Sequence, residues 1–117
     1  FNHKEADDCC YLKLTREGVA KHLGQDVSAE QAALMYGTKK PTNGQVFGEK
    51  ITDAAWEKKP SWYIVSLQDH MLNTDLQKAM AKKIDANVTT LDASHAPHIS
   101  QPDAVANVIL DAVNTLK

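Results

Sequence analysis

Two residues of this chain have side chains suited to proton transfer, and each stands just beyond a segment expected to be a strand. Asp69 follows the apolar run Trp62 to Leu67, and His95 follows a second β-favouring segment, Val88 to Leu91. A carboxylate that accepts a hydrogen bond from one imidazole nitrogen fixes the tautomer, so the other nitrogen can take a proton from a hydroxyl. Histidine suits this role because its reference pKa of about 6.5 lies near neutral pH. The pair predicts the acid and the general base of a hydrolytic triad, whose third member is a nucleophile.

The second half of the chain supplies the elements that would position this pair. The run from Trp62 to Leu67 is aromatic and β-branched without strict alternation, which predicts a strand of a parallel sheet, buried on both faces. Thr74-Asp75-Leu76-Gln77 matches a capping box and predicts a crossover helix of about three turns. Pro102 begins the last predicted helix, whose apolar stripe runs from Val105 to Leu116. Catalytic groups gather at the carboxyl ends of parallel strands, so the two side chains are expected to meet there.

Two helices are predicted in the first half of the chain. Thr15 can cap a helix of about two turns that ends at Gly24. Ser28-Ala29-Glu30-Gln31 is a capping box, and it opens an Ala-rich helix that reaches about Tyr36. We therefore expect two short helices in this part of the chain.

The rest of the first half is expected to be mostly irregular. Its glycines, Pro41 and Asn43 predict a loop with one helical turn over 37–49, and Thr52 to Trp56 predicts another short capped turn. Cys9 to Leu14 is compatible with a short extended segment. No sheet of its own is expected before Pro60.

Composition excludes several classes of function. The 117 residues are 43% hydrophobic and 24% charged, as expected for one small folded domain. A formal charge of -2 without a basic stripe gives no reason to expect nucleic acid or an anionic membrane as partner. The apolar runs are too short to span a bilayer, and the first five residues lack the apolar core of a signal peptide. We expect a soluble protein, cytoplasmic or secreted, and a start at Phe1 fits a processed product or a piece of a longer chain.

No cofactor or metal is expected. The adjacent Cys9 and Cys10 match neither a disulfide framework nor a zinc-ligand spacing, so we interpret them as small packed residues, with a redox pair or a thiol nucleophile for His95 as alternatives. His98 stands three residues after His95, but Pro97 disfavours helix between them and no third ligand has a clear spacing.

Two other residues compete for roles near the pair. Asp92 is close to His95 in sequence and is therefore a rival for the acid. His70 directly follows Asp69 and is a candidate for the mouth of a pocket, whereas His3 and His22 are expected to be solvated.

Several segments of the second half resemble the late part of an α/β-hydrolase, in the order found in that family. They are Pro60 to Val65, Gln68-Asp69, Leu76-Gln77, Met80 to Lys83, Ser94-His95 and Ser100 to Ala106. The resemblance is greatest to the bacterial esterase-like branch, and more weakly Leu14 to Trp56 resembles the lid that these enzymes insert before their last strands. It implies an α/β fold in which residues 1–58 are a small helical lid and residues 59–117 the C-terminal β-α-β-α part of the parallel sheet. It also implies that Asp69 is the triad acid, in preference to Asp92, and His95 the base, because the family order is nucleophile, acid, histidine.

The nucleophile of such an enzyme is missing from the sequence. It normally stands on a sharp GxSxG-like turn, and none of the serines has that glycine spacing (Ser28, Ser61, Ser66, Ser94 and Ser100). The glycine-containing loop that helps to build an oxyanion hole is missing too. An Asp–His pair alone is not a competent esterase.

Three hypotheses follow, of which we prefer the first. The chain contributes lid, acid and base to a composite enzyme for carboxylic esters or related acyl substrates, and its partner is an N-terminal, nucleophile-bearing part. Alternatively, it is a noncatalytic truncated remnant that pairs with a second copy of itself through strand edges. The third hypothesis is an unrelated small α/β binding module. The chain is thus expected to be an enzyme only in combination with the missing part.

Overall fold

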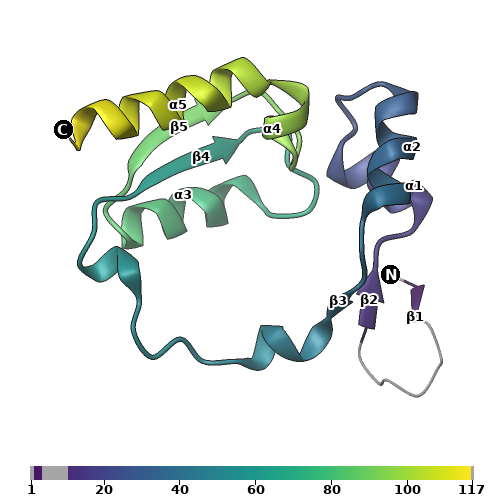
Figure 1. Ribbon diagram of the computed structural model, residues 1–117, viewed down its shortest axis with the longest axis horizontal. Coiled ribbons are helices and arrows are strands. Elements are labelled where there is room, and N and C mark those ends of the chain that lie inside the picture. The colour runs from purple at the N-terminus through teal and green to yellow at the C-terminus, as the bar shows by residue number, and fades with distance from the viewer. Residues whose placement is uncertain (1, 4–10, 117) are drawn as a thin grey trace.

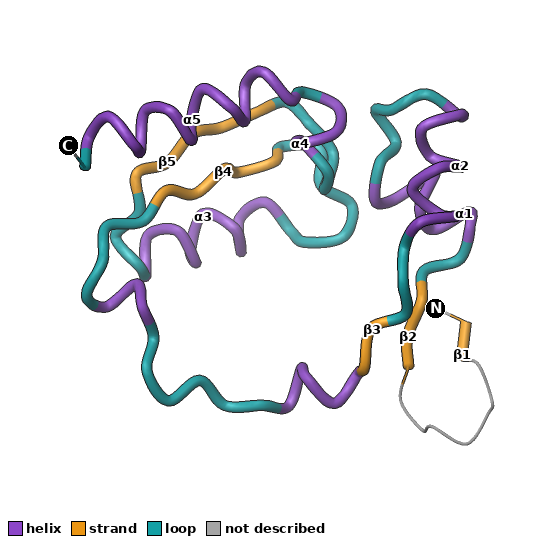
Figure 2. The backbone as a smooth tube through the Cα atoms, in the orientation of Figure 1, coloured by secondary structure: helices purple, strands orange, loops and turns teal. Residues whose placement is uncertain are grey.

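The first half contains a small antiparallel sheet that the sequence did not predict. The computed structural model describes residues 2–3 and 11–116. Strand β2 (Tyr11–Lys13) lies between β1 (Asn2–His3) and β3 (Thr42–Asn43), and Leu12 pairs with Thr42 (Figures 1 and 2). The expectation of no sheet before Pro60 was therefore wrong. Strands of two or three residues are too short for a hydrophobic period, and this pairing joins residues thirty positions apart, about which local pattern carries no information.

The two predicted N-terminal helices are present. The Thr15 hydroxyl accepts a hydrogen bond from the Gly18 backbone N–H at 3.0 Å, so Thr15 caps α1 (Arg16–Gly18). The chain continues directly into a π-helical turn, η1 (Val19–Leu23), which ends at Gly24 as expected. Ser28 and Gln31 form the predicted capping box at 3.2 Å in both directions, and α2 (Ala29–Thr38) runs two residues beyond the expected end.

A long irregular segment joins the two halves of the chain. It includes two 3₁₀ turns, η2 (Gly44–Gly48) and η3 (Ala55–Glu57), and Figure 2 shows it as an open arc below the parallel strands. The predicted helical turn in 37–49 is confirmed as η2. The predicted cap before Trp56 was wrong, because η3 starts after Ala54 without a side-chain cap. Large apolar side chains along the arc are exposed (Val46, Phe47, Ile51 and Trp56).

The second half forms the predicted parallel β-α-β unit. Strands β4 (Trp62–Ser66) and β5 (Asn87–Leu91) pair in parallel, from Trp62 opposite Asn87 to Ser66 opposite Leu91, and α3 (Thr74–Lys83) is the crossover. Two further hydrogen bonds continue beyond the strands, from the Leu67 N–H to the Leu91 carbonyl and from the Gln68 N–H to the Ala93 carbonyl. The loops that follow β4 and β5 therefore leave the sheet side by side.

Helices cover both faces of the parallel pair. Figure 1 shows α3 on one face and α5 (Pro102–Thr115) on the other, with the short α4 (Pro97–Ser100) leading into α5. The buried core includes Val65, Ala81 and Val108. Only Val65 and Ser66 of β4 are buried. Several apolar residues toward the C-terminal end of α5, including Ile109, are exposed. The parallel sheet has two strands among the described residues, and two strands alone cannot bury both faces of a sheet completely. None of the described helices is long and apolar enough to cross a membrane.

The predicted capping box at Thr74 was wrong. Asn73 is the cap of α3, and its side-chain oxygen accepts from the backbone N–H groups of Asp75 at 2.9 Å and Leu76 at 3.2 Å. Asparagine is among the best capping residues, so the helix starts one residue earlier than predicted. This leaves the Gln77 side chain free to make other contacts.

Candidate active site

The loop after β4 holds Asp69 in a fixed orientation. One carboxylate oxygen, Oδ1, accepts hydrogen bonds from the backbone N–H groups of Met71 at 2.7 Å and Leu72 at 2.9 Å. An aspartate that bonds the backbone two residues on stabilises a turn, which explains the sharp reversal between β4 and α3. The side chain is only 3% exposed. The carboxylate is therefore fixed by local backbone and shielded from water.

The other oxygen, Oδ2, faces His95. Its distance to His95 Nδ1 is 2.8 Å, and the Gln77 side-chain amide donates to the same oxygen at 2.9 Å. Gln77 is buried, at 3% exposed, and its carbonyl oxygen accepts from the Ser66 backbone N–H at 3.0 Å. That bond fixes the amide with its NH₂ group toward Asp69, because only the oxygen can accept from an N–H.

Four hydrogen bonds thus surround the Asp69 carboxylate. Burial alone would raise the pKa of Asp69, but the bonds from His95, Leu72 and Met71 outweigh it and hold the pKa below its ordinary value. All four partners donate hydrogen bonds, which favours the ionised form of Asp69. At neutral pH the imidazole of His95 therefore faces a carboxylate. A carboxylate at Nδ1 favours the tautomer in which Nδ1 carries the proton and Nε2 has a free lone pair.

His95 stands at the surface beside this buried acid. Its side chain is 39% exposed, and it lies between two fully buried neighbours, Ser94 and Ala96. The imidazole borders a pocket of about 260 Å³ whose other walls include Asp69 and the β4 residues Trp62 and Tyr63. An exposed imidazole with a buried carboxylate behind it can accept a proton from a group that enters this pocket.

The rival acid has a different partner. Asp92 accepts from the Gln68 side-chain amide at 2.9 Å through Oδ1, and its carbonyl oxygen accepts from Gln101. The structure therefore pairs His95 with Asp69, in agreement with the prediction that the ends of the two strands bring these side chains together.

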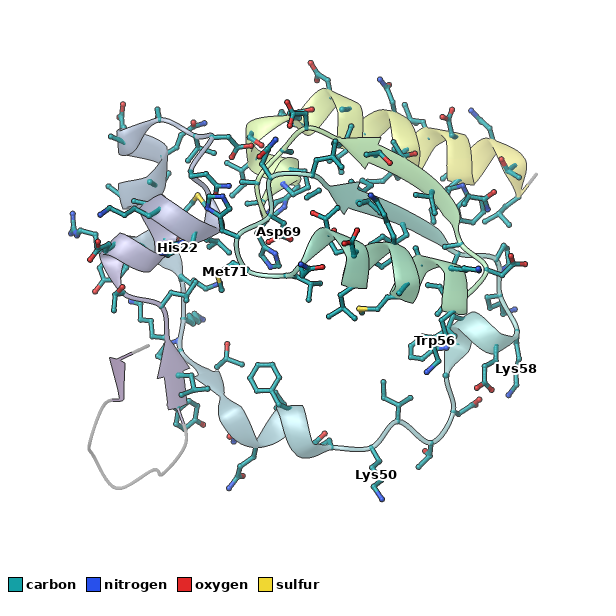
Figure 3. The ribbon with its side chains drawn as sticks, turned by 180° about the vertical axis from the view of Figure 1, so that it is seen from behind. His22, Lys50, Trp56, Lys58, Asp69 and Met71 are labelled. Atoms are coloured by element: carbon teal, nitrogen blue, oxygen red, sulfur yellow. The ribbon has the colours of Figure 1, made fainter. Side chains whose placement is uncertain are left out.

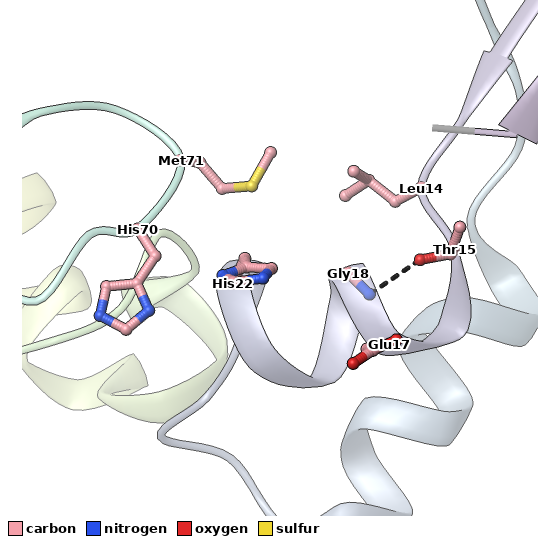
Figure 4. Close-up of a pocket in the computed structure, with 7 residues that line it drawn as sticks. All are labelled: Leu14, Thr15, Glu17, Gly18, His22, His70 and Met71. Atoms are coloured by element: carbon pink, nitrogen blue, oxygen red, sulfur yellow. Dashed lines mark hydrogen bonds between the residues drawn. The ribbon is translucent and has the colours of Figure 1, made fainter.

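Two other histidines, His22 and His70, line a different pocket from the one that Asp69 and His95 border. His22 and His70 have ring centroids 6.0 Å apart and line a pocket of about 480 Å³ together with Glu17 and Met71 (Figure 4). Figure 3 shows the same neighbourhood, where the loop that carries Asp69 and Met71 comes close to His22. His70 thus lines a pocket as predicted, and so does His22, which is exposed but was predicted only as solvated.

Residues 2–3 and 11–116 contain no cluster of three His, Cys, Asp or Glu side chains that could hold a metal ion. Cys9, Cys10 and the side chain of His3 lie outside what the structure describes.

Sequence reasoning missed two residues that contact the pair's surroundings. Gln77 was assigned to a capping box. Its position in the first turn of the helix that follows Asp69 would also have allowed its side chain to reach the Asp69 carboxylate. The second is Asp26, whose Oδ2 accepts from the Ser94 backbone N–H at 2.8 Å across 68 residues of sequence. Nothing in the local pattern around Asp26 indicates that contact.

The serines nearest to this site do not present a nucleophile. Ser66 and Ser94 are 4% and 0% exposed, and Ser94 already accepts a hydrogen bond from the Ala96 N–H through its hydroxyl. A buried, engaged hydroxyl cannot attack a substrate in the pocket. The described residues of this site thus pair a carboxylate with an imidazole and present no attacking hydroxyl beside them.

Comparison with known proteins agrees with this architecture. The alpha/beta hydrolase family matches residues 11–108. The chain belongs to that family. No curated protein matches the chain. Membership supports the parallel β4–β5 pair with helices on both faces as part of a hydrolase fold, and suggests a small molecule as substrate.

Proposed function

We propose that this chain supplies the acid and the general base for hydrolysis of carboxylic esters or related acyl compounds. The observation that carries the proposal is the 2.8 Å contact between a buried Asp69 and an exposed His95 at the carboxyl ends of two parallel strands. The nucleophile comes from a further part of the hydrolase, on this polypeptide or on another.

The two residues act in sequence on one proton. As the nucleophile's hydroxyl attacks the ester carbonyl, His95 Nε2 takes its proton, and the carboxylate of Asp69 stabilises the imidazolium. The tetrahedral intermediate then collapses, the bond to the alcohol breaks, and the imidazolium returns the proton to the leaving alkoxide. A water molecule repeats both steps on the acyl-enzyme and releases the carboxylic acid. Asp69 keeps its negative charge throughout.

The outer edge of β4 is the place where the nucleophile-bearing part fits. Only one edge of β4 is paired, by β5, in the described sheet. The pocket beside His95 is lined by Trp62, Tyr63 and Ile64 of β4. A third parallel strand along this edge would end next to His95, so a turn at its carboxyl end would bring a serine to the imidazole.

Residues 1–58 act as the lid and residues 59–117 as the core part in this proposal. Support comes from the exposed apolar side chains of the first part, among them Leu34, Phe47 and Ile51. Apolar side chains that are exposed here favour a hydrophobic acyl or aryl group once the missing part closes the site.

Turnover of a p-nitrophenyl ester by the chain combined with its nucleophile-bearing part tests the proposal. His95→Ala should lower kcat at least about 10³-fold, because no other group takes the proton, and should leave the circular dichroism spectrum unchanged. His98→Ala is the matched control, since His98 is exposed three residues further on and should keep turnover within about twofold. Retained turnover in His95→Ala would refute the assignment, and a combination that never turns over ester would refute the activity.

A further inference from the structure

One short segment of the first half touches both loops that carry the acid–base pair. The carbonyl of Lys21 lies 3.2 Å from His70 Nδ1, and the Gln25 side-chain amide donates to the Gln68 carbonyl. His70 and Gln68 are the two neighbours of Asp69 in the sequence. We call residues 21–26 the clamp segment, because it contacts the residue before Asp69 and the residue after it.

The third contact of the clamp segment holds the His95 loop. Asp26 Oδ2 accepts from the Ser94 backbone N–H at 2.8 Å, and Ser94 is 0% exposed. The Ser94 hydroxyl in turn accepts from the Ala96 N–H at 3.2 Å, which closes a tight turn with His95 at its centre. Asp26 therefore bonds the first residue of the turn that presents the imidazole.

The charge of Asp26 strengthens this contact. Burial would raise the pKa of Asp26, but hydrogen bonds from the hydroxyl and the N–H of Ser94 outweigh it and lower the pKa below its ordinary value. The group is thus a carboxylate at neutral pH, and hydrogen bonds to a charged acceptor are stronger than neutral ones.

We propose that Asp26 is a positioning residue that holds the Ser94–Ala96 turn so that His95 Nδ1 stays within hydrogen-bond distance of Asp69. The inference rests on the proposed function, since it concerns the same pair. The turn lies between β5 and α4, and the imidazole is partly exposed. Without Asp26 the buried N–H of Ser94 loses its acceptor. The free-energy cost of an unpaired buried N–H then favours a displaced turn in which water can accept from it.

The contact also links the two halves of the chain. Asp26 lies between η1 and α2, whose packing sets where the carboxylate stands, and Ser94 lies 68 residues later. Placement of the first half therefore affects the geometry of the general base directly. A shift of the turn by about 1 Å is enough to lower kcat about a hundredfold, whereas binding of substrate is affected less.

Nitrogen-15 NMR of the His95 imidazole in the 117-residue chain tests the inference without any turnover. The wild-type chain at neutral pH should show the tautomer protonated at Nδ1. Asp26→Ala should lose that preference, whereas Asp26→Asn keeps an oxygen acceptor for the Ser94 N–H and should retain it. Glu30→Ala is the matched control, because it removes an exposed carboxylate four residues on and should change nothing. An unchanged tautomer in Asp26→Ala, or equal loss in Asp26→Asn, would overturn the inference.

Kinetics of the combined enzyme provide a second readout. Asp26→Ala should lower kcat about tenfold to a hundredfold with KM within about twofold, and Asp26→Asn should restore most of kcat. Asp26→Glu covers the case in which Asp26→Ala does not fold, because it keeps the charge and moves the acceptor by one methylene. It should lower kcat severalfold, and an unchanged kcat contradicts a positioning role. If the proposed function itself fails, His95→Ala keeps its turnover, while the tautomer measurement still decides the role of Asp26.

Discussion

Replacement of Asp69 by Asn tests the proposed pair most sharply, because it changes charge and hydrogen bonding without changing shape. The wild-type carboxylate accepts two backbone N–H groups through Oδ1 and two side-chain donors, Gln77 and His95, through Oδ2. An amide has one acceptor oxygen, so its NH₂ group must face one of these two pairs of donors. Backbone N–H groups cannot change their role, so the amide oxygen stays with them and the NH₂ group turns toward His95.

The consequence is a wrong tautomer at the base. Gln77 cannot adapt, because the Ser66 N–H fixes its amide. His95 can adapt by moving its proton to Nε2 and accepting from the introduced amide through Nδ1, which leaves Nε2 unable to take a proton. In a serine-protease triad the same substitution lowers kcat about 10⁴-fold. We expect a loss of the same order here, with KM little changed, and about 1–3 kcal/mol of lost stability from the weakened contacts of a buried group.

Two measurements check this reasoning. Ester turnover by the combined enzyme gives kcat and KM, and nitrogen-15 NMR reports which imidazole nitrogen of His95 carries the proton. Asp92→Asn is the matched control, since Asp92 contacts Gln68 and Gln101 instead of the imidazole, and it should keep kcat within about threefold. If Asp92→Asn is the damaging change, or if Asp69→Asn keeps more than about a tenth of kcat, the choice of acid is wrong.

Two further predictions concern the stability of the site. Gln77→Met should lower the free energy of unfolding by about 2–5 kcal/mol in urea titrations, because the Ser66 N–H and the Leu72 carbonyl each lose a buried partner. Gln45→Met, at an exposed position, is the control and should have little effect. An equal loss of stability in Gln45→Met would contradict the argument. Stability should also depend on pH: the folded-state pKa of Asp69 is lowered, so its contribution is complete above the unfolded pKa of about 3.9 and is lost as the pH falls through the folded value. Unfolding measured from about pH 7 to about pH 2 should show this decline, and Asp69→Asn should reduce it; an identical pH profile in the variant would count against the lowered pKa.

Local sequence was a good guide where a structure depends on nearest neighbours. The capping box at Ser28 predicted the start of α2, and Thr15 predicted the start of α1, because a capping side chain bonds backbone only two or three residues away. The same rule failed at Thr74, because Asn73 and Thr74 are both good capping residues and Asn73 is the one that caps α3. The three-stranded sheet was missed because its short strands have partners distant in sequence.

The meeting of Asp69 and His95 was predictable from the sequence for a simple reason. Residues that follow parallel strands must share one edge of the sheet, so Asp69 and His95 were expected to meet once β4 and β5 were recognised. What the sequence determined by itself was therefore this pair and the strand order that brings it together. Only the tertiary structure decided what holds the pair, since Gln77 and Asp26 act through contacts that side-chain direction and long-range packing create. Asp26 reaches Ser94 across 68 residues, and a contact of that kind exists only after the two halves of the chain have packed.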